Sequence, residues 1–295
     1  MKECNLCPRL CGAARDSGRL GFCGQGNEVR VARSSLHFYE EPVISGSRGS
    51  GTVFFSGCSL RCVFCQNKDI STDGFGKEIT IGRLAEIFLE LQDKGALNIN
   101  LVTPTHYTLQ IIDAVKIARA KGLKLPIVYN TSSYEKVETI KLLEGIVDIW
   151  LPDFKYMDNT AAQRYSKAPD YVENAKAAIA EMVRQQPECA FNEDGIIQKG
   201  VIVRHLVLPG QTQRAKDAVQ YLYDCYGDSI FISIMSQYTP CTDLGDYPEI
   251  NRKLTAEEYD DVVDFAVEIG VENGFLQEGE SASESFIPPF NLEGV

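Results

Sequence analysis

Short apolar, β-rich runs alternate with amphipathic helical patterns along most of this chain. Leu84, Ile87, Phe88 and Leu91 illustrate the helical pattern, because they fall at i, i+3, i+4 and i+7 and share one helix face. The expected strands are residues 52–55, 98–102, 127–130, 147–151, 201–208 and 230–235. The expected helices are residues 84–95, 108–121, 135–143 and 160–185, one between the last two strands, and one ending at Gly270.

This order of elements predicts parallel βαβ units, because strands spaced by helices pair in parallel with helical crossovers. About six repeats fit a partial (β/α)6 barrel, and an open doubly wound sheet is the alternative. The last helix carries its own start signal, since Thr255 and Glu258 form a capping box. Residues 1–40 are rich in Cys, Gly and Arg without a helical period. We therefore expect a cysteine-rich cap over 1–40 and an α/β domain with a C-terminal extension over 41–295.

Charge and cysteine content narrow the class of protein. The 295 residues carry a net charge of −12, which argues against a nucleic-acid backbone or an anionic membrane as main partner. We see no apolar signal segment and no apolar run of membrane-spanning length. Seven of the ten cysteines lie in two close-spaced groups, which favours metal binding in a reducing cytoplasm over disulfides. Cys189, Cys225 and Cys241 are scattered, and we expect ordinary thiols there.

The first group, Cys58, Cys62 and Cys65, has the spacing C-x3-C-x2-C directly after the first expected strand. Three thiolates this close suit three irons of a [4Fe-4S] cube, and the fourth iron is left open to bind a small molecule. A structural zinc site or buried free thiols are the alternatives. Polar Ser59 and Arg61 between the cysteines do not suit a core strand.

The second group, near the N-terminus, has the spacing C-x2-C-x3-C-x11-C. Its members are Cys4, Cys7, Cys11 and Cys23. Four soft ligands within twenty residues indicate a metal-nucleated cap that could not bury a core by itself. Zinc and a second [4Fe-4S] cluster both fit four thiolates, and reduced thiols without metal are the third possibility.

Polar residues follow the expected strands where a parallel barrel would place its functional groups, at the strands' carboxyl ends. These residues are Thr103, Thr105 and His106, then Asn130, Thr131 and Ser132, then Asp153 and Lys155, then Arg204 and His205, then Ser236, Gln237 and Tyr238. Taken singly, each has an ordinary explanation as a surface pair, a turn or a core histidine. Together they predict one polar mouth.

The cysteine triplet, with aromatic Phe64 just before its last member, resembles the signature of the radical S-adenosylmethionine (SAM) superfamily. The resemblance implies that the open iron chelates SAM and that one electron breaks the sulfonium C–S bond. The resulting 5′-deoxyadenosyl radical abstracts hydrogen from a substrate. It further implies that the triplet ligates the cluster, that Phe64 flanks the adenine, and that the fold is the partial (β/α)6 barrel. The Gly-Gly-Glu type loop common in the superfamily is absent.

A narrower resemblance is to the pyruvate formate-lyase activating enzyme branch, which shares the D-x-K pair of Asp153 and Lys155 and the segment from Arg204 to Gly210. It implies that Asp153, Lys155 and His205 lie beside SAM. Asn130 and Thr131 stand where that branch has an Asp-Thr pair for a monovalent cation. Thr103 and Thr105 are further candidates, for the amino-acid end of SAM. The cysteine head resembles an uncharacterised subgroup labelled as similar to that activating enzyme.

The resemblance implies an anaerobic enzyme that makes a glycyl radical on a partner protein. Its partners would be SAM, a protein or peptide substrate, and a one-electron donor such as flavodoxin or ferredoxin. Radical modification of another peptide or of a small molecule is the second hypothesis. A non-catalytic iron–sulfur or zinc protein is the third.

Overall fold

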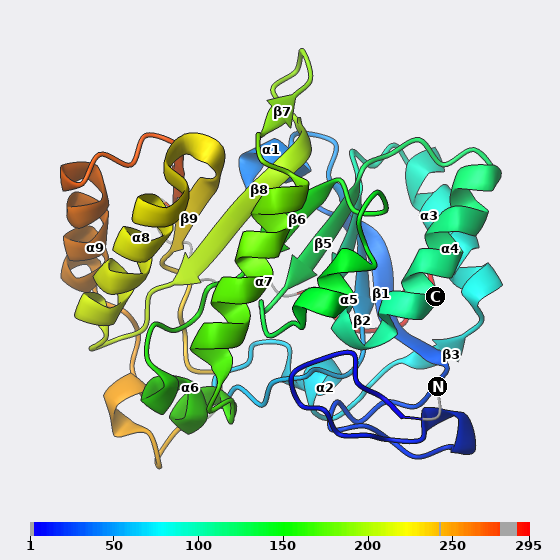
Figure 1. Ribbon diagram of the computed structural model, residues 1–295, viewed down its shortest axis with the longest axis horizontal. Coiled ribbons are helices and arrows are strands. Elements are labelled where there is room, and N and C mark those ends of the chain that lie inside the picture. The colour runs from blue at the N-terminus through cyan, green and yellow to red at the C-terminus, as the bar shows by residue number, and fades with distance from the viewer. Residues whose placement is uncertain (1–2, 242, 278–287) are drawn as a thin grey trace.

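A ten-stranded, mostly parallel sheet forms the centre of the computed structural model, which describes residues 3–241, 243–277 and 288–295. Its strands follow the order β10-β9-β8-β6-β5-β4-β2-β1-β3 (Figure 1). The parallel strands are β2 (Ser50–Phe55), β4 (Ile99–Val102), β5 (Ile127–Thr131), β6 (Ile149–Pro152), β8 (Ile197–Leu206), β9 (Phe231–Met235) and β10 (Gly274–Leu276). The six expected strands are all present, and the predicted unclosed (β/α) barrel is confirmed.

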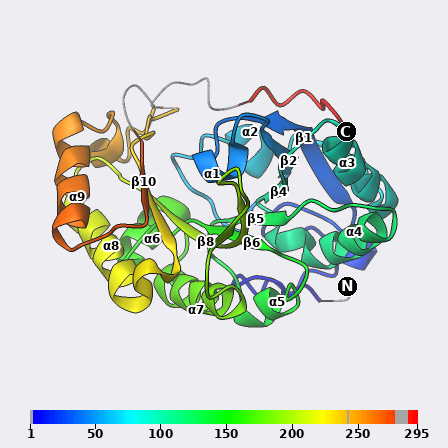
Figure 2. The same cartoon turned by 90° about the horizontal axis from the view of Figure 1, so that it is seen from above.

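Helices cover the outer side of this arc, as Figure 2 shows for α4, α5, α7 and α8. The longer helices are α3 (Ile81–Asp93), α4 (Thr108–Ala120), α5 (Val137–Lys141), α6 (Asn159–Ser166), α7 (Tyr171–Gln185), α8 (Thr212–Tyr226) and α9 (Ala256–Glu268). Short ones are α1 (Pro42–Ser45), α2 (Lys68–Ser71) and the 3₁₀ turns Arg15–Ser17, Thr105–Tyr107, Gly227–Ser229 and Pro248–Ile250. The predicted face of α3 is buried, and the capping box of α9 is present.

The single helix predicted across residues 160–185 is wrong, because the chain breaks it into α6 and α7. Lys167 ends α6 in the left-handed conformation at φ 55°. Pro169 follows two residues later, and proline disfavours helical geometry in the residue before it. The break points the backbone carbonyls of Ser166 and Lys167 away from the helix, where they meet the N-terminal cysteine-rich segment.

Antiparallel strands that the sequence analysis did not predict join the sheet beyond β2 and beside β8. β1 (Val29–His37) pairs with β2 and with β3 (Lys77–Ile79), while β7 (Ala190–Phe191) pairs with β8. Residues 29–37 fall within the expected 1–40 cap, yet they lie in the main sheet because apolar residues such as Val31 are fully buried there. Residues 3–28 precede the sheet.

The C-terminal residues return to the β1 side of the sheet. The Ser34 N–H donates to the Glu293 carbonyl at 2.8 Å, and the Leu292 N–H donates to Ala32 at 3.1 Å. Arg33 forms a 2.6 Å ion pair with Glu293. Residues 278–287 of the expected C-terminal extension lie outside the described residues.

The lumen, the space enclosed by the curved sheet, is lined by apolar side chains towards the amino ends of the strands and by polar side chains towards their carboxyl ends. Ile44 of α1 packs against inward-facing aliphatic residues of three central strands. Those residues are Val128, Ile149, Leu151, Ile197 and Ile202. This plug closes the lumen towards the amino ends of the strands and leaves the carboxyl ends for a cavity.

Candidate functional site

A cavity of about 240 Å³ lies at the carboxyl ends of the parallel strands. The cysteine triplet shares its wall with side chains from the ends of β4, β5, β6, β8 and β9. Of the predicted site residues, Cys58, Cys62, Phe64, Cys65, Thr103, Asn130, Thr131, Asp153 and Lys155 line it. Groups nearly a hundred positions apart in sequence therefore face one space.

The triplet lies on the loop that follows β2, and each of its thiols has a polar neighbour. The Cys62 Sγ lies 3.0 Å from the Ser166 hydroxyl, and the Cys65 Sγ lies 3.3 Å from that of Ser71. The Leu60 N–H donates to the Cys58 Sγ at 3.4 Å. Burial raises the pKa of the Cys58 thiol to about 12 and that of Cys62 to about 11. Such thiols keep their protons at neutral pH unless a metal replaces them.

The triplet fits a cluster by its donor set. None of the ten cysteines, all within the described residues, forms a disulfide. Three soft donors converge on one cavity, and hydroxyl and amide hydrogens are available to bond their sulfurs. Within the described part of the chain, no group of three or more His, Cys, Asp or Glu is already set at metal-binding geometry, and this is equally true of both cysteine groups.

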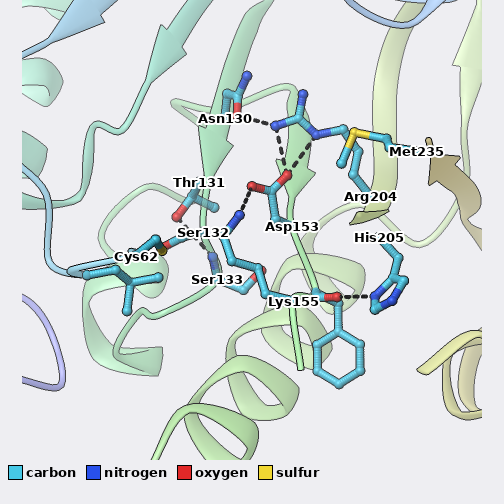
Figure 3. Close-up of polar contacts among 12 residues, drawn as sticks. Cys62, Asn130, Thr131, Ser132, Ser133, Asp153, Lys155, Arg204, His205 and Met235 are labelled. Carbon is cyan, nitrogen blue, oxygen red and sulfur yellow. Dashed lines mark hydrogen bonds and ion pairs between the residues drawn. The ribbon is translucent and has the colours of Figure 1, made fainter. Parts of the chain in front are cut away.

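A charged network of side chains from the ends of β5, β6 and β8 forms another part of the cavity wall (Figure 3). The Asp153 carboxylate accepts from the Lys155 Nζ at 2.7 Å and from the Arg204 Nε at 2.8 Å. The Arg204 guanidinium also donates to the Asn130 Oδ1 at 2.7 Å. Burial alone would raise the pKa of Asp153, but Arg204 and Lys155 outweigh it and lower the pKa. Asp153 is therefore a buried anion held between two cations.

Glu40 completes this network, and the sequence analysis did not identify it. Its carboxylate accepts from Arg204 at 3.0 Å, from the Asn100 Nδ2 at 3.1 Å and from the Asn130 Nδ2 at 3.3 Å. Burial raises its pKa. β1 runs antiparallel to β2, so Glu40 enters the lumen from the amino ends of the strands. A search of carboxyl strand ends cannot find such a residue, although the alternating pattern of residues 29–37 could have revealed its strand.

His205 does not line the cavity, in contrast to Arg204 before it. Consecutive side chains of a strand point to opposite faces, and Figure 3 shows these two pointing apart. The His205 Nδ1 lies 2.6 Å from the Phe154 carbonyl oxygen, and the ring faces a separate small pocket beside Tyr165. Burial lowers its pKa to about 4, so the ring is neutral.

Thr105 also lies away from the cavity wall. Its side chain contacts a buried carboxyl group behind that wall. The hydroxyls of Thr105 and Thr131 both donate to the Glu135 Oε1 at 2.6 Å. Thr103, which does line the cavity, adopts φ 59°, a left-handed conformation that costs energy in a residue with a Cβ. Phe64 packs edge-on against Tyr238 with ring centroids 5.7 Å apart.

The buried carboxyl group of Glu135 should make the free energy of unfolding depend measurably on pH. Burial raises its pKa from 4.5 to about 7, so the native state prefers the protonated form. Its contribution to stability is therefore complete below pH 4.5 and is lost as pH rises to about 7, a loss on the order of 3 kcal/mol. Glu135→Gln removes this titration but keeps the Oε1 acceptor. We expect the variant to gain stability relative to wild type between pH 5 and pH 8 in anaerobic urea unfolding.

Glu138→Gln is the matched control, because this side chain on α5 is 77% exposed. It should leave the pH profile of the unfolding free energy unchanged. Parallel pH profiles for wild type and Glu135→Gln would contradict the assignment of Glu135 as a carboxyl that is protonated in the native state.

Comparison with known proteins defines the class. Residues 52–222 match the family model of the radical SAM superfamily, and the chain belongs to that superfamily. It is 32% identical over 274 residues to the uncharacterized protein MJ0674 of Methanocaldococcus jannaschii. That match covers 90% of this chain and 74% of the relative.

Solved structures share the fold at low sequence identity. Streptococcus suis SuiB bound to S-adenosylmethionine superposes with TM-score 0.51 and 15% identity, over 77% of this chain and 52% of that one. The FeFe-hydrogenase maturase HydG from Carboxydothermus hydrogenoformans gives TM-score 0.51 and 9% identity, over 80% and 56%. The chain thus spans about half the length of these structures.

Family membership makes the protein an enzyme of the radical SAM class, with a [4Fe-4S] cluster and SAM as its cofactors. The hypothesis of a non-catalytic iron–sulfur or zinc protein loses support accordingly. Among the helices of the described residues, none has the length and apolar character needed to cross a membrane.

Proposed function

We propose that this protein is a glycyl-radical-enzyme activase-like enzyme, in which Cys58, Cys62 and Cys65 hold the cluster. When bound, the cluster supplies one electron for cleavage of SAM and leaves one iron open to its amino and carboxylate groups. Reductive cleavage of bound SAM would release methionine and a 5′-deoxyadenosyl radical, which would take a hydrogen atom from a substrate C–H bond to give 5′-deoxyadenosine and a substrate radical. The carrying observation is that the thiol triplet and the Asp153–Lys155 pair face one cavity.

The chain's own residues supply what bound SAM requires. Lys155 bears a positive charge, because the attraction of Asp153 outweighs burial and raises its pKa. Its remaining N–H groups can donate to a carboxylate. Thr103, Asn130 and Thr131 offer hydroxyl and amide groups to the amino-acid and ribose ends, and Phe64 offers a flat apolar surface to the adenine.

Aromatic side chains at the rim of the cavity suit a peptide substrate. His37 packs edge-on against Tyr39 at 5.7 Å and against Phe54 at 6.0 Å between ring centroids, and all three residues line the cavity. Tyr39 is 56% exposed. Aromatic rings of this kind contact the apolar parts of a main-chain segment. The polar tip of a tyrosine ring can also form hydrogen bonds with the amides of that segment.

Electron supply and location follow from the same chemistry. We propose a flavodoxin or ferredoxin as the one-electron donor, because reductive cleavage of SAM consumes one electron. A cytoplasmic location agrees with ten cysteines that form no disulfide.

Variants at the rim test substrate type. Tyr39→Ala should lower formation of a glycyl radical on a candidate partner by about ten-fold, because a peptide loses an aromatic contact. It should leave the slow, uncoupled release of 5′-deoxyadenosine unchanged. The measurements are electron paramagnetic resonance of the partner and chromatography of the nucleoside, both after anaerobic reduction with SAM present.

Phe38→Ala is the matched control, since Phe38 is 50% exposed but does not line the cavity. It should leave both readouts unchanged. Deuterium transfer into 5′-deoxyadenosine from a small molecule, with no radical on any glycyl radical enzyme encoded nearby, would replace the activase proposal with the second hypothesis.

A further inference from the structure

The four head cysteines gather into one group although nineteen positions separate the first from the last. A Cβ added at Gly21 would lie 3.2 Å from the Cys23 Sγ and 3.5 Å from the Cys11 Sγ. The Cys4 N–H donates to the Ala13 carbonyl at 3.0 Å, and the Leu10 N–H donates to the Cys7 carbonyl at 3.1 Å, so tight turns bring these residues together. The head therefore folds back on itself and brings its cysteines near one another, although within the described residues no three of them are already set at metal-binding geometry.

A backbone amide bonds one sulfur of the neighbouring triplet, where the Leu60 N–H donates to the Cys58 Sγ at 3.4 Å. Metal-bound thiolates use such bonds, because they disperse the negative charge on sulfur.

A buried cation stands beside the same centre. Arg15 is only 2% exposed, and its Nη1 lies 3.9 Å from the Cys4 Sγ. A group of four thiolates around a metal carries net negative charge, which a buried guanidinium offsets. The same guanidinium donates to the Gly26 and His106 carbonyl oxygens, which hold it beside Cys4.

The head has too little apolar surface to hold itself together. Its own buried apolar cluster consists of Cys4, Leu6 and Ala13. Segments of this size rely on disulfides or a metal, and no disulfide is present among these cysteines. A bound metal would supply the cross-link that such a segment needs.

We propose that Cys4, Cys7, Cys11 and Cys23 bind a closed four-thiolate metal centre, and that this centre holds the cluster loop in place. The first half stands on the head alone. The second half rests on the proposed function, in which the triplet ligates the cluster. Four protein ligands leave no open position, and none of the four cysteines lines the SAM cavity, so the role of the centre is structural.

The head touches the cluster loop directly before its first cysteine. A Cβ at Gly57 would lie 2.7 Å from the Cys23 carbonyl oxygen and would clash with the Gln25 Cγ. Gly57 also adopts φ +87°, so glycine is required there both for space and for conformation. Any shift of Cys23 therefore displaces the backbone that carries Cys58.

Arg9 extends this contact to the second cysteine of the triplet. Its guanidinium donates to the Ser59 carbonyl at 2.7 Å and to the Ser166 carbonyl at 3.4 Å. The Ser166 hydroxyl lies 3.0 Å from the Cys62 Sγ. Because Arg9 is two residues from Cys7, it connects the proposed metal centre to the cluster loop and to the end of α6 that contacts Cys62.

Metal analysis of a variant without the triplet tests the first half. Protein carrying Cys58→Ser, Cys62→Ser and Cys65→Ser together, purified without oxygen, should retain about one zinc ion or about four irons per chain. Adding Cys11→Ser and Cys23→Ser should remove that metal. Zinc without sulfide identifies a zinc site, and iron with sulfide identifies a second cluster. A triplet variant with no bound metal would overturn the proposal, whatever the fate of the proposed function.

The second half of the proposal, that the head metal centre holds the cluster loop in place, is tested in protein whose cysteine triplet is intact. Arg9→Ala keeps all seven clustered cysteines and should retain the head metal, but it should lower cluster content or cluster-dependent SAM cleavage on the order of ten-fold. Arg19→Ala, at an exposed arginine of the same segment, is the control and should change neither. Full cluster content and SAM cleavage in both Arg9→Ala and the Cys11→Ser, Cys23→Ser variant would refute the coupling. Circular dichroism of each variant verifies that it is folded.

Discussion

Cys62→Ala should reduce cleavage of SAM by the reduced protein to the background level. The Cys62 thiol lines the cavity beside Cys58 and Cys65, and a [4Fe-4S] cube with one open iron needs all three thiolates. Alanine removes the sulfur without adding bulk, so the barrel has no steric reason to unfold. Release of 5′-deoxyadenosine and methionine, measured after anaerobic reconstitution and reduction, reports the loss. Iron and sulfide analysis should show that cluster assembly has failed.

Cys225→Ala is the matched control, because this exposed cysteine lies on α8 and is not part of the cavity wall. It should retain wild-type cluster content and turnover. Undiminished SAM cleavage by Cys62→Ala would show that a different set of thiols carries the chemistry, and the ligand assignment would fall.

Asp153→Ala should weaken SAM binding while the cluster stays in place. The carboxylate fixes both Lys155 and Arg204, and its removal leaves two buried cations without their shared anion. Breaking a buried ion pair from one side costs about 3–5 kcal/mol of stability. We expect the Kd for SAM to rise by about ten- to a hundred-fold, because Lys155 loses its fixed position. Anaerobic equilibrium dialysis with labelled SAM measures the Kd.

Asp148→Asn provides the control at the amino end of the same strand. Asp148 pairs with Arg119 at 3.2 Å, remote from the strand ends that form the cavity. This variant should bind SAM like wild type. Unchanged affinity in Asp153→Ala would remove Asp153 from the SAM site.

The lowered pKa of Asp153 adds a pH signature to the same experiment. A carboxyl whose native pKa lies below its ordinary 3.8 stabilises the fold above that pH and loses this contribution as pH falls further. Wild type should therefore lose stability on acidification below pH 4 more steeply than Asp153→Ala.

Two residues of one motif show where sequence reasoning stopped. Arg204 and His205 stand side by side in the segment shared with the activating-enzyme branch, and the histidine was the predicted SAM contact. The structure turns Arg204 into the cavity and His205 towards a small pocket behind it. The pairing of β8 with β6 and β9 decides which of its faces points into the cavity. The sequence does not reveal this face, because β8 carries a run of buried residues on both faces.

The sequence by itself determined the six strands, their parallel order and the two cysteine groups, because apolar periodicity and ligand spacing are local properties of the chain. Only the tertiary structure decided that Glu40 enters the lumen from the opposite end and that residues 29–37 join the sheet. It alone brought the N-terminal thiols against Gly57. These contacts join segments that lie dozens of residues apart in the sequence. They depend on which strands pair and how side chains pack, and no short stretch of sequence specifies either.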